Sequence, residues 1–126
     1  MENDELLPKG RSVQARLWPQ VASAKGGGAF PAAKLAPDFF DYVAKSAFGM
    51  LWSREQLAIR DRSLVTCAQL AALGQLEELK AHLRGALNLG ITQEELTEVM
   101  MQTAIYAGVP AANAALRTAA EVFGIE

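Results

Sequence analysis

The sequence predicts an all-α fold, a single domain of five to six helices. Its 126 residues include 23 Ala and 16 Leu against only 11 Val plus Ile. Ala and Leu favour helices, whereas the β-branched residues favour sheets. Apolar residues also recur at three- and four-residue steps through most of the chain, which is the period of a helix that buries one face. The length fits one domain that covers residues 1–126.

Residues 1–36 indicate an N-terminal helix followed by a glycine-rich loop. Apolar side chains lie four residues apart between residues 6 and 23, and Pro19 predicts a break or kink because a proline inside a helix removes a backbone hydrogen bond. Three consecutive glycines followed by Pro31 predict a mobile loop over residues 25–31.

The middle of the chain predicts two further helices. The first starts at Pro37, a residue well suited to the first turn, and has Gly49 near its C-terminal cap. The next sequence, Ser53-Arg54-Glu55-Gln56, has the form of a capping box, in which a serine and a glutamate or glutamine satisfy the first backbone N–H groups of a helix. That helix is expected to end at Gly74.

The last third predicts three helices with clear ends. Residues 75–88 are amphipathic and stop at Gly90, and Thr92-Gln93-Glu94-Glu95 forms a second capping box. Gly108-Val109-Pro110 separates the helix that starts there from an Ala-rich last helix. The predicted inward residues of the second of these three helices are Leu96, Val99, Met100, Thr103 and Ala107.

Composition excludes several classes of protein. One Cys cannot form an intramolecular disulfide, and one His with one Cys cannot form a structural zinc site, so a reducing, cytoplasmic setting is expected. The acidic N-terminus lacks the positive region of a signal peptide, and no stretch approaches the roughly eighteen apolar residues of a membrane span. A net charge of −2 without a basic run argues against nucleic acid as a partner.

The hydrophobic content predicts self-association. A chain this short buries only about two-thirds of the surface that its unfolded form exposes. With 51 % hydrophobic residues, apolar surface is expected to remain on the folded monomer and to be covered in a homo-oligomer.

Six sequence blocks lie between residues 62 and 120: Arg62-Ser63-Leu64-Val65-Thr66, Ala71-Ala72-Leu73-Gly74, Glu77-Glu78-Leu79-Lys80-Ala81-His82, Ala86-Leu87-Asn88-Leu89-Gly90-Ile91-Thr92, Glu94-Glu95-Leu96 and Gln102-Thr103-Ala104-Ile105-Tyr106-Ala107-Gly108-Val109-Pro110-Ala111-Ala112. In order and spacing these blocks resemble the carboxymuconolactone decarboxylase family. Weaker similarity reaches back to Phe39, so residues 39–123 match best.

The resemblance implies an orthogonal helical array of the alkylhydroperoxidase D type and homo-oligomers, trimers or hexamers. For the founding branch it implies decarboxylation of 4-carboxymuconolactone to the 3-oxoadipate enol-lactone, a step of protocatechuate breakdown. The electrons left by CO2 move through the ring double bond onto the lactone carbonyl, so neither pyridoxal, thiamine nor a metal is implied.

The peroxidase branch of the same superfamily uses a Cys-x-x-Cys pair followed four residues later by a His. Counted back from His82, this chain has Glu78 and Gln75 at the two cysteine positions, and Ser63 where an upstream Glu would stand. Because disulfide exchange needs two sulfurs, dithiol peroxidase activity is not expected. Cys67, among apolar neighbours, is interpreted as a core residue with a raised pKa, and a lone nucleophile is the alternative.

His82 is the main catalytic candidate, since its ordinary pKa lies near neutrality. It lies between Leu79 and Leu83 at the edge of an apolar helix face, with Glu78 one turn before it. Taken alone, the residues favour a histidine that only orients a helix. The resemblance favours a proton donor or shuttle at the wall of a sheltered, arginine-lined cavity, with Glu78 in contact with the substrate site.

Arginine suits the recognition of a carboxylated substrate, because its planar fork pairs with both carboxylate oxygens. Arg54, Arg60 and Arg62 cluster within nine residues. Arg62 opens a family-like block and is assigned as a catalytic carboxylate anchor, with Arg54 as a second substrate-binding cation. Ordinary solvated charge, paired with Glu55 or Asp61, is the alternative and is expected for at least one of the three.

Three other side chains are candidates for substrate binding. Ser63 offers a hydroxyl, Trp52 a pocket wall, and Tyr106 either a hydroxyl for the lactone or simple packing. Two other functions stay open beside the decarboxylase. One is a non-catalytic oligomer that binds a small acidic metabolite or a protein partner, and the other is a thiol-dependent peroxidase that uses Cys67.

Overall fold

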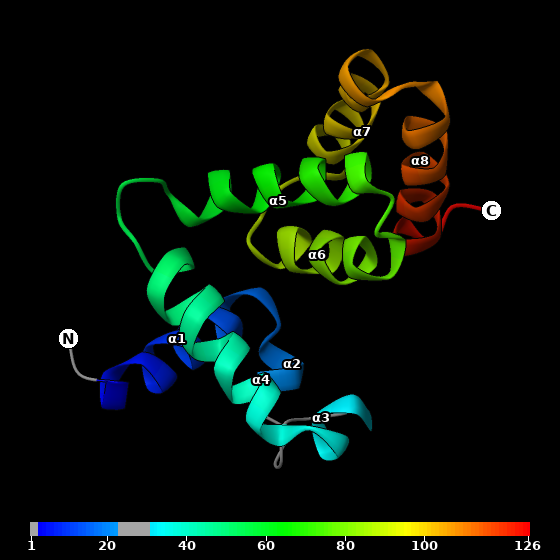
Figure 1. Cartoon of the computed structure of the whole chain (residues 1–126). Coiled ribbons are helices and arrows are strands. Elements are labelled where there is room, and N and C mark those ends of the chain that lie inside the picture. Colours follow the sequence, from blue (N-terminus) through cyan, green and yellow to red (C-terminus); the bar gives the residue numbers. More distant parts are fainter. Residues whose placement is uncertain (1–2, 23–30) are drawn as a thin grey trace. The chain divides into compact units, whose positions relative to one another are not determined.

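The computed structural model describes residues 3–22 and 31–126, and in these residues every regular element is a helix (Figure 1). The all-α prediction is therefore confirmed. All but the last residue of the predicted loop at 25–31 lies outside the described residues. The chain divides into two compact units, Met1–Ile59 (unit 1) and Arg60–Glu126 (unit 2), and each is described by itself. The single domain expected over residues 1–126 stays a prediction.

Unit 1 contains more and shorter helices than the sequence predicts. Pro19, Pro31 and Pro37 each open a new helix, because proline has no N–H to donate and the first turn of a helix needs none. The break expected at Pro19 is confirmed, and it separates the first two helices. The elements are α1 (Asn3–Leu17), α2 (Pro19–Ala22), α3 (Pro31–Leu35), α4 (Pro37–Val43) and the π-helix η2 (Ala44–Trp52).

Two glycines bring α1 and η2 into backbone contact. A Cβ atom at Gly10 would lie 1.9 Å from the carbonyl oxygen of Ala44, and one at Gly49 would lie 2.4 Å from the carbonyl oxygen of Leu6. The prediction that Gly49 caps a helix is wrong. It lies inside η2 and is buried, and its missing side chain serves close helix packing.

The predicted capping box at residues 53–56 is also wrong. Ser53 has helical backbone angles (φ −78°, ψ −8°) and ends η2, whereas an N-cap residue is extended. Its N–H donates to the carbonyl oxygen of Phe48 and its hydroxyl donates to that of Gly49, so both groups complete the preceding helix. Helix α5 begins only at Ile59, after an irregular segment.

An aromatic stack fixes the end of η2 against the core of unit 1. The ring of Phe48 packs edge to face with Trp18, at 5.8 Å between the ring centroids, and lies tilted against Trp52, at 5.5 Å between the centroids. Phe48 is buried, so Trp52 is held at the margin of this core. The other buried apolar residues described in unit 1 are Leu6, Leu17, Ala33 and Ala44.

Four helices of 13 to 15 residues build the second half of the chain, and Figure 1 shows them from green to red. They are α5 (Ile59–Leu73), α6 (Leu76–Asn88), α7 (Gln93–Ala107) and α8 (Val109–Phe123). Their ends follow the sequence: Gly74 and Gly108, with φ of +71° and +102°, take conformations that other residues rarely adopt. The four helices share one core, made of Cys67, Ala71, Leu79, Leu83, Ala86, Ile91, Leu96, Met100, Ala115 and Ala119.

The predicted capping box of α7 is confirmed. The Thr92 hydroxyl accepts the backbone N–H of Glu95 at 3.0 Å, and the Glu95 carboxylate accepts that of Thr92 at 3.0 Å. The backbone hydrogen bond from Thr92 lowers the pKa of Glu95, and the ion pair with Arg60 acts in the same direction. Of the predicted inward residues, Ala107 is exposed because α7 ends there.

Exposed apolar side chains occur where α7 ends and α8 begins, and the surface of these two helix segments is here called the α7–α8 face. Ile105 and Tyr106 are 75 % and 86 % exposed, and Met101 and Val109 are also exposed. A groove of about 260 Å³ runs along this face. It is lined by Met101, Ala104, Val109, Ala112, Asn113 and Leu116. None of the helices in the described ranges combines the length and hydropathy of a membrane span.

Candidate functional site

Each unit contains some of the candidate residues predicted from the sequence. The first turns of α5 carry Arg62 and Ser63, and α6 carries Glu78 and His82 one turn apart. The remaining candidates are Tyr106 near the end of α7, in the same unit, and Trp52 and Arg54 in unit 1.

His82 lies where the sequence predicts, at the edge of the core of unit 2. Its neighbours Leu79 and Leu83 are fully buried in the cluster that also holds Cys67 of α5. The imidazole is half-buried, and its Nδ1 atom is enclosed. Burial lowers the pKa of His82 from 6.5 to about 4, because the charged ring would lose its hydration. The imidazole is therefore neutral at neutral pH.

This lowered pKa predicts that the protein loses stability in mild acid. Between pH 6.5 and about 4 the unfolded chain binds a proton at His82 and the folded chain does not, so the free energy of unfolding falls as the pH falls. The expected loss from this group is about 2 kcal/mol between roughly pH 7 and pH 5. Urea unfolding at both pH values measures it. The His82→Gln variant should lose less stability than the natural chain, and equal losses in both would contradict the prediction.

Ser63 carries a buried polar atom that calls for a ligand or a water molecule. Its side chain is fully buried on the inner face of α5, and Oγ has no hydrogen-bond partner among the described residues. A buried hydroxyl without a partner costs about 1–3 kcal/mol. Arg62, the preceding residue, is half-buried with its Nε enclosed, which is unusual for an arginine.

Two candidates of unit 2 lie toward solvent. Glu78 is exposed on α6, one turn before His82. Tyr106 belongs to the α7–α8 face and is 86 % exposed. Its ring therefore does not pack inside unit 2, which was the alternative to a role in substrate binding. Both side chains are accessible to a substrate or to a second chain.

The structure resolves two alternatives left open by the sequence. Cys67 is fully buried, and burial raises the pKa of its thiol to about 12, so the thiolate needed for nucleophilic or redox chemistry is not formed at neutral pH. The core interpretation is confirmed. Arg60 forms an ion pair with Glu95, which confirms that one of the three clustered arginines is a surface pair, although neither Glu55 nor Asp61 is its partner.

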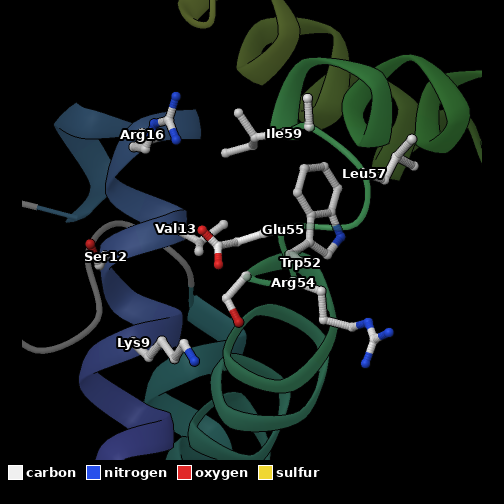
Figure 2. A pocket seen from close by; sticks show the side chains of 11 residues that line it. Lys9, Ser12, Val13, Arg16, Trp52, Arg54, Glu55, Leu57 and Ile59 are labelled. Atoms are coloured by element: carbon white, nitrogen blue, oxygen red, sulfur yellow. The ribbon is translucent and has the colours of Figure 1, made fainter.

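A cavity of about 460 Å³ lies within unit 1 (Figure 2). It includes two candidates, Trp52 and Arg54, and adds the cations Lys9 and Arg16, which sequence reasoning missed. Their seven-residue separation, which places both on one face of α1, was the available signal. The lining consists of Lys9, Ser12, Val13, Arg16, Trp52, Ser53, Arg54, Glu55, Leu57, Ala58 and Ile59.

The cavity that the sequence predicts at His82 stays a prediction. Neither the cavity of unit 1 nor the α7–α8 groove is lined by His82, Arg62 or Ser63. Ser63 is buried on α5, and Arg62 on the same helix and His82 on α6 are each partly buried.

Known proteins are similar to parts of this chain. A 4-carboxymuconolactone decarboxylase from Acinetobacter baylyi is 48 % identical over 86 residues, which are 68 % of this chain and 64 % of the relative. A nitrosuccinic acid decarboxylase from Metarhizium robertsii is 34 % identical over 70 residues, 56 % of this chain and 49 % of the relative. An uncharacterized 15.0 kDa protein from Paracoccus denitrificans is 33 % identical over 95 residues, 74 % of this chain and 71 % of the relative.

The chain thus spans less than two thirds of the length of the two named decarboxylases. The family model described as the carboxymuconolactone decarboxylase family matches residues 37–121, close to the range 39–123 predicted from the sequence blocks. That range holds all seven candidate residues and most of the helical structure. The chain belongs to the carboxymuconolactone decarboxylase family.

Proposed function

We propose that the chain is a cytoplasmic carboxy-lyase that converts 4-carboxymuconolactone to the 3-oxoadipate enol-lactone in the breakdown of aromatic compounds. The observation that carries the proposal is the half-buried imidazole of His82, in a chain 48 % identical over 86 residues to a protein named 4-carboxymuconolactone decarboxylase. The test is direct: when purified protein is mixed with this lactone, the absorbance of the lactone should fall and CO2 should be released. A chain that binds the lactone without turnover would support the non-catalytic alternative.

The reaction asks little of the protein beyond binding and one proton. The bond between the ring carbon and its carboxylate breaks, CO2 leaves, and the electron pair moves through the ring double bond to the lactone carbonyl. One proton then adds to the resulting dienolate carbon. The protein must hold the carboxylates, stabilise the negative oxygen and deliver that proton.

His82 suits the proton delivery because its charge depends on what lies beside it. Without substrate its pKa is about 4 and the ring is neutral. A carboxylate beside the ring raises the pKa, since the opposite charge stabilises the imidazolium. Binding of the substrate thereby causes His82 to take up a proton from the solvent. His82 then donates this proton to the dienolate carbon. Giving up this proton returns the ring to its neutral form before product leaves.

Arg62 and Ser63 serve the two oxygen-bearing ends of the substrate. Arg62 binds the carboxylate that is retained, through its planar guanidinium. The Ser63 hydroxyl, buried without a partner among the described residues, donates to the lactone carbonyl oxygen as negative charge grows there. Glu78 and Tyr106 lie at the exposed margin and bind the remaining polar groups of the substrate.

Replacing Arg62 by lysine is expected to lower kcat/KM about tenfold to hundredfold, mainly through KM. Lysine keeps the charge but cannot form two parallel hydrogen bonds to a carboxylate. Steady-state turnover of the lactone measures the change. Arg60→Lys is the matched control, because Arg60 is paired with Glu95 and should leave kcat/KM within about twofold. Equal kinetics in the Arg62 variant and the natural chain would exclude Arg62 as the anchor.

We also propose that the chain forms a homo-oligomer, a trimer or hexamer, through the α7–α8 face. Light scattering should give the mass of three or six chains. Ile105→Glu, in the exposed apolar surface of α7, should produce smaller species with unchanged helical circular dichroism. Leu73→Glu is the control, since Leu73 is similarly exposed at the end of α5 and does not line the groove of that face. A monomer of the natural chain at micromolar concentration would contradict the proposal.

A further inference from the structure

Exposed apolar side chains also occur in unit 1, on α3 and α4. Leu35 at the end of α3 is 87 % exposed, and Phe39 and Tyr42 of α4 are 56 % and 64 % exposed. The rings of Phe39 and Tyr42 lie 6.5 Å apart between centroids, so both belong to one surface. The surface of Leu35, Phe39 and Tyr42, together with the charged residues Asp38 and Lys45, is here called the α4 face.

The two charges of the α4 face lie on one continuous helix. α4 runs into η2 without a break, since Ala44 has helical backbone angles and its N–H donates to the carbonyl oxygen of Phe40 (Figure 1). Tyr42 follows Asp38 by four residues and precedes Lys45 by three, so the three residues share one side of this helix. Tyr42 therefore lies between an acidic and a basic residue, which are about 10 Å apart along the helix axis.

Neither of these two charges is neutralised by a residue that the structure describes. Within residues 3–22 and 31–126, Asp38 and Lys45 form no ion pair, whereas the neighbouring Asp41 pairs with Arg11 at 2.7 Å. Asp38 is exposed and Lys45 is partly exposed, so both are accessible to another molecule. The α4 face thus offers an apolar centre with one unpaired charge of each sign.

We propose that the α4 face binds the α4 face of a second copy of this chain about a two-fold axis. Such an axis requires a self-complementary surface, because each contact between residue i of one copy and residue j of the other occurs twice. With the axis near Tyr42 the two helices run antiparallel, so Asp38 of each copy lies opposite Lys45 of the other copy. An acidic residue on one side of the apolar centre and a basic residue on the other meet this requirement.

The apolar area of the α4 face is close to what a pair of chains needs. Because an aromatic side chain offers about 150–250 Å², the exposed parts of Leu35, Phe39 and Tyr42 amount to roughly 400 Å² per copy. A standard interface buries about 800 Å² per partner, and somewhat more than half of that area is apolar. The inference goes beyond the proposed function, because none of these residues is assigned to the lactone site or lines the α7–α8 groove.

Charge reversal tests the two-fold contact, with light scattering as the readout. If the α7–α8 face closes a ring of three chains, as proposed above, the two-fold contact joins two rings and the natural chain has the mass of six. Asp38→Lys and Lys45→Asp each place like charges opposite one another twice, so each should weaken the contact at least about tenfold and halve the mass on dilution. The double variant Asp38→Lys/Lys45→Asp restores opposite charges and should recover the natural mass.

Asp61→Lys is the matched control, because it makes the same charge change in the first turn of α5 and should keep the natural mass. An unchanged mass in both single variants would overturn the proposal. A double variant that associates no better than the single variants would overturn it as well.

A cross-link locates the contact. The chain has one Cys, so in Tyr42→Cys/Cys67→Ala the introduced thiol is the only one, and two such thiols meet at the proposed axis. Bismaleimidoethane, a short reagent that joins two thiols, should convert most of this variant to a covalent dimer at micromolar concentration. Ser12→Cys/Cys67→Ala carries its thiol at an exposed position of α1 and should run as a single chain on a denaturing gel. Equal cross-linking of both variants, or no dimer from the Tyr42 variant, would overturn the proposal.

One more variant separates this inference from the contact proposed for the α7–α8 face. Ile105→Glu should leave pairs of chains held by the α4 face, and Ile105→Glu/Asp38→Lys should leave single chains. A natural chain that forms pairs and loses them in Asp38→Lys would support the two-fold contact and refute only the ring of three. A natural chain with the mass of three would overturn the two-fold contact and leave the α7–α8 face standing. None of these measurements depends on turnover of the lactone.

Discussion

Replacing His82 by glutamine is expected to reduce kcat/KM for 4-carboxymuconolactone by about 10² to 10⁴, the usual contribution of a general acid or base. Glutamine keeps a polar group of similar length but cannot carry a proton at neutral pH. The half-buried position of His82 between Leu79 and Leu83 allows the substitution without a large loss of packing. The rate at which the lactone absorbance falls and the rate of CO2 release measure the effect. Circular dichroism checks that the helices are retained.

Cys67→Ala is the matched control for the His82 variant. Cys67 lies in the same core cluster as the neighbours of His82, so its replacement perturbs the same region without removing a proton carrier. Turnover should stay within about threefold, since a thiol with a pKa of about 12 takes no part in chemistry at neutral pH. An active His82→Gln variant would remove His82 from the mechanism. Peroxide consumption that disappears in Cys67→Ala would instead revive the thiol-dependent alternative.

Replacing Gly10 by alanine is expected to destabilise the protein by about 3 kcal/mol or more, at the upper end of overpacking effects. The new Cβ atom would lie 1.9 Å from the backbone oxygen of Ala44, so α1 and η2 must move apart. In an ordinary helix the same change stabilises by about 0.5–1 kcal/mol, which makes the sign of the effect diagnostic. Urea unfolding followed by Trp fluorescence measures it, because both Trp residues lie in unit 1.

Ser12→Ala serves as the control for Gly10→Ala. Ser12 lies on the same helix and is exposed, so the free energy of unfolding should change by less than about 0.5 kcal/mol. A Gly10→Ala variant as stable as the natural chain would show that α1 does not pack on η2 through this glycine.

Helix ends were predictable where neighbouring residues alone decide them. Thr92 caps α7 through its own hydroxyl and Glu95, and Gly74 and Gly108 stop helices because they adopt positive φ. Gly49 and Ser53 show the limit of such signals. A glycine and a serine occur there too. Gly49, however, lies inside η2 and contacts the backbone of Leu6, and Ser53 completes the hydrogen bonds at the end of η2.

The candidate site divides in the same way. Helical periodicity placed Cys67 inside the core and His82 at its edge, because burial on a helix repeats every three to four residues. Periodicity did not reveal the exposure of Tyr106, which follows from the packing of α7 with α8. It also did not reveal that Lys9 and Arg16 meet the segment after η2.

The sequence by itself determined the all-α class, the family and the burial of Cys67 beside the partly buried His82, because propensity, caps and periodicity act over a few residues. Only the tertiary structure decided how α1 packs on η2, which cations line a cavity and which hydroxyl is buried without a partner. The first two features join residues more than thirty positions apart, and all three arise only when the helices pack.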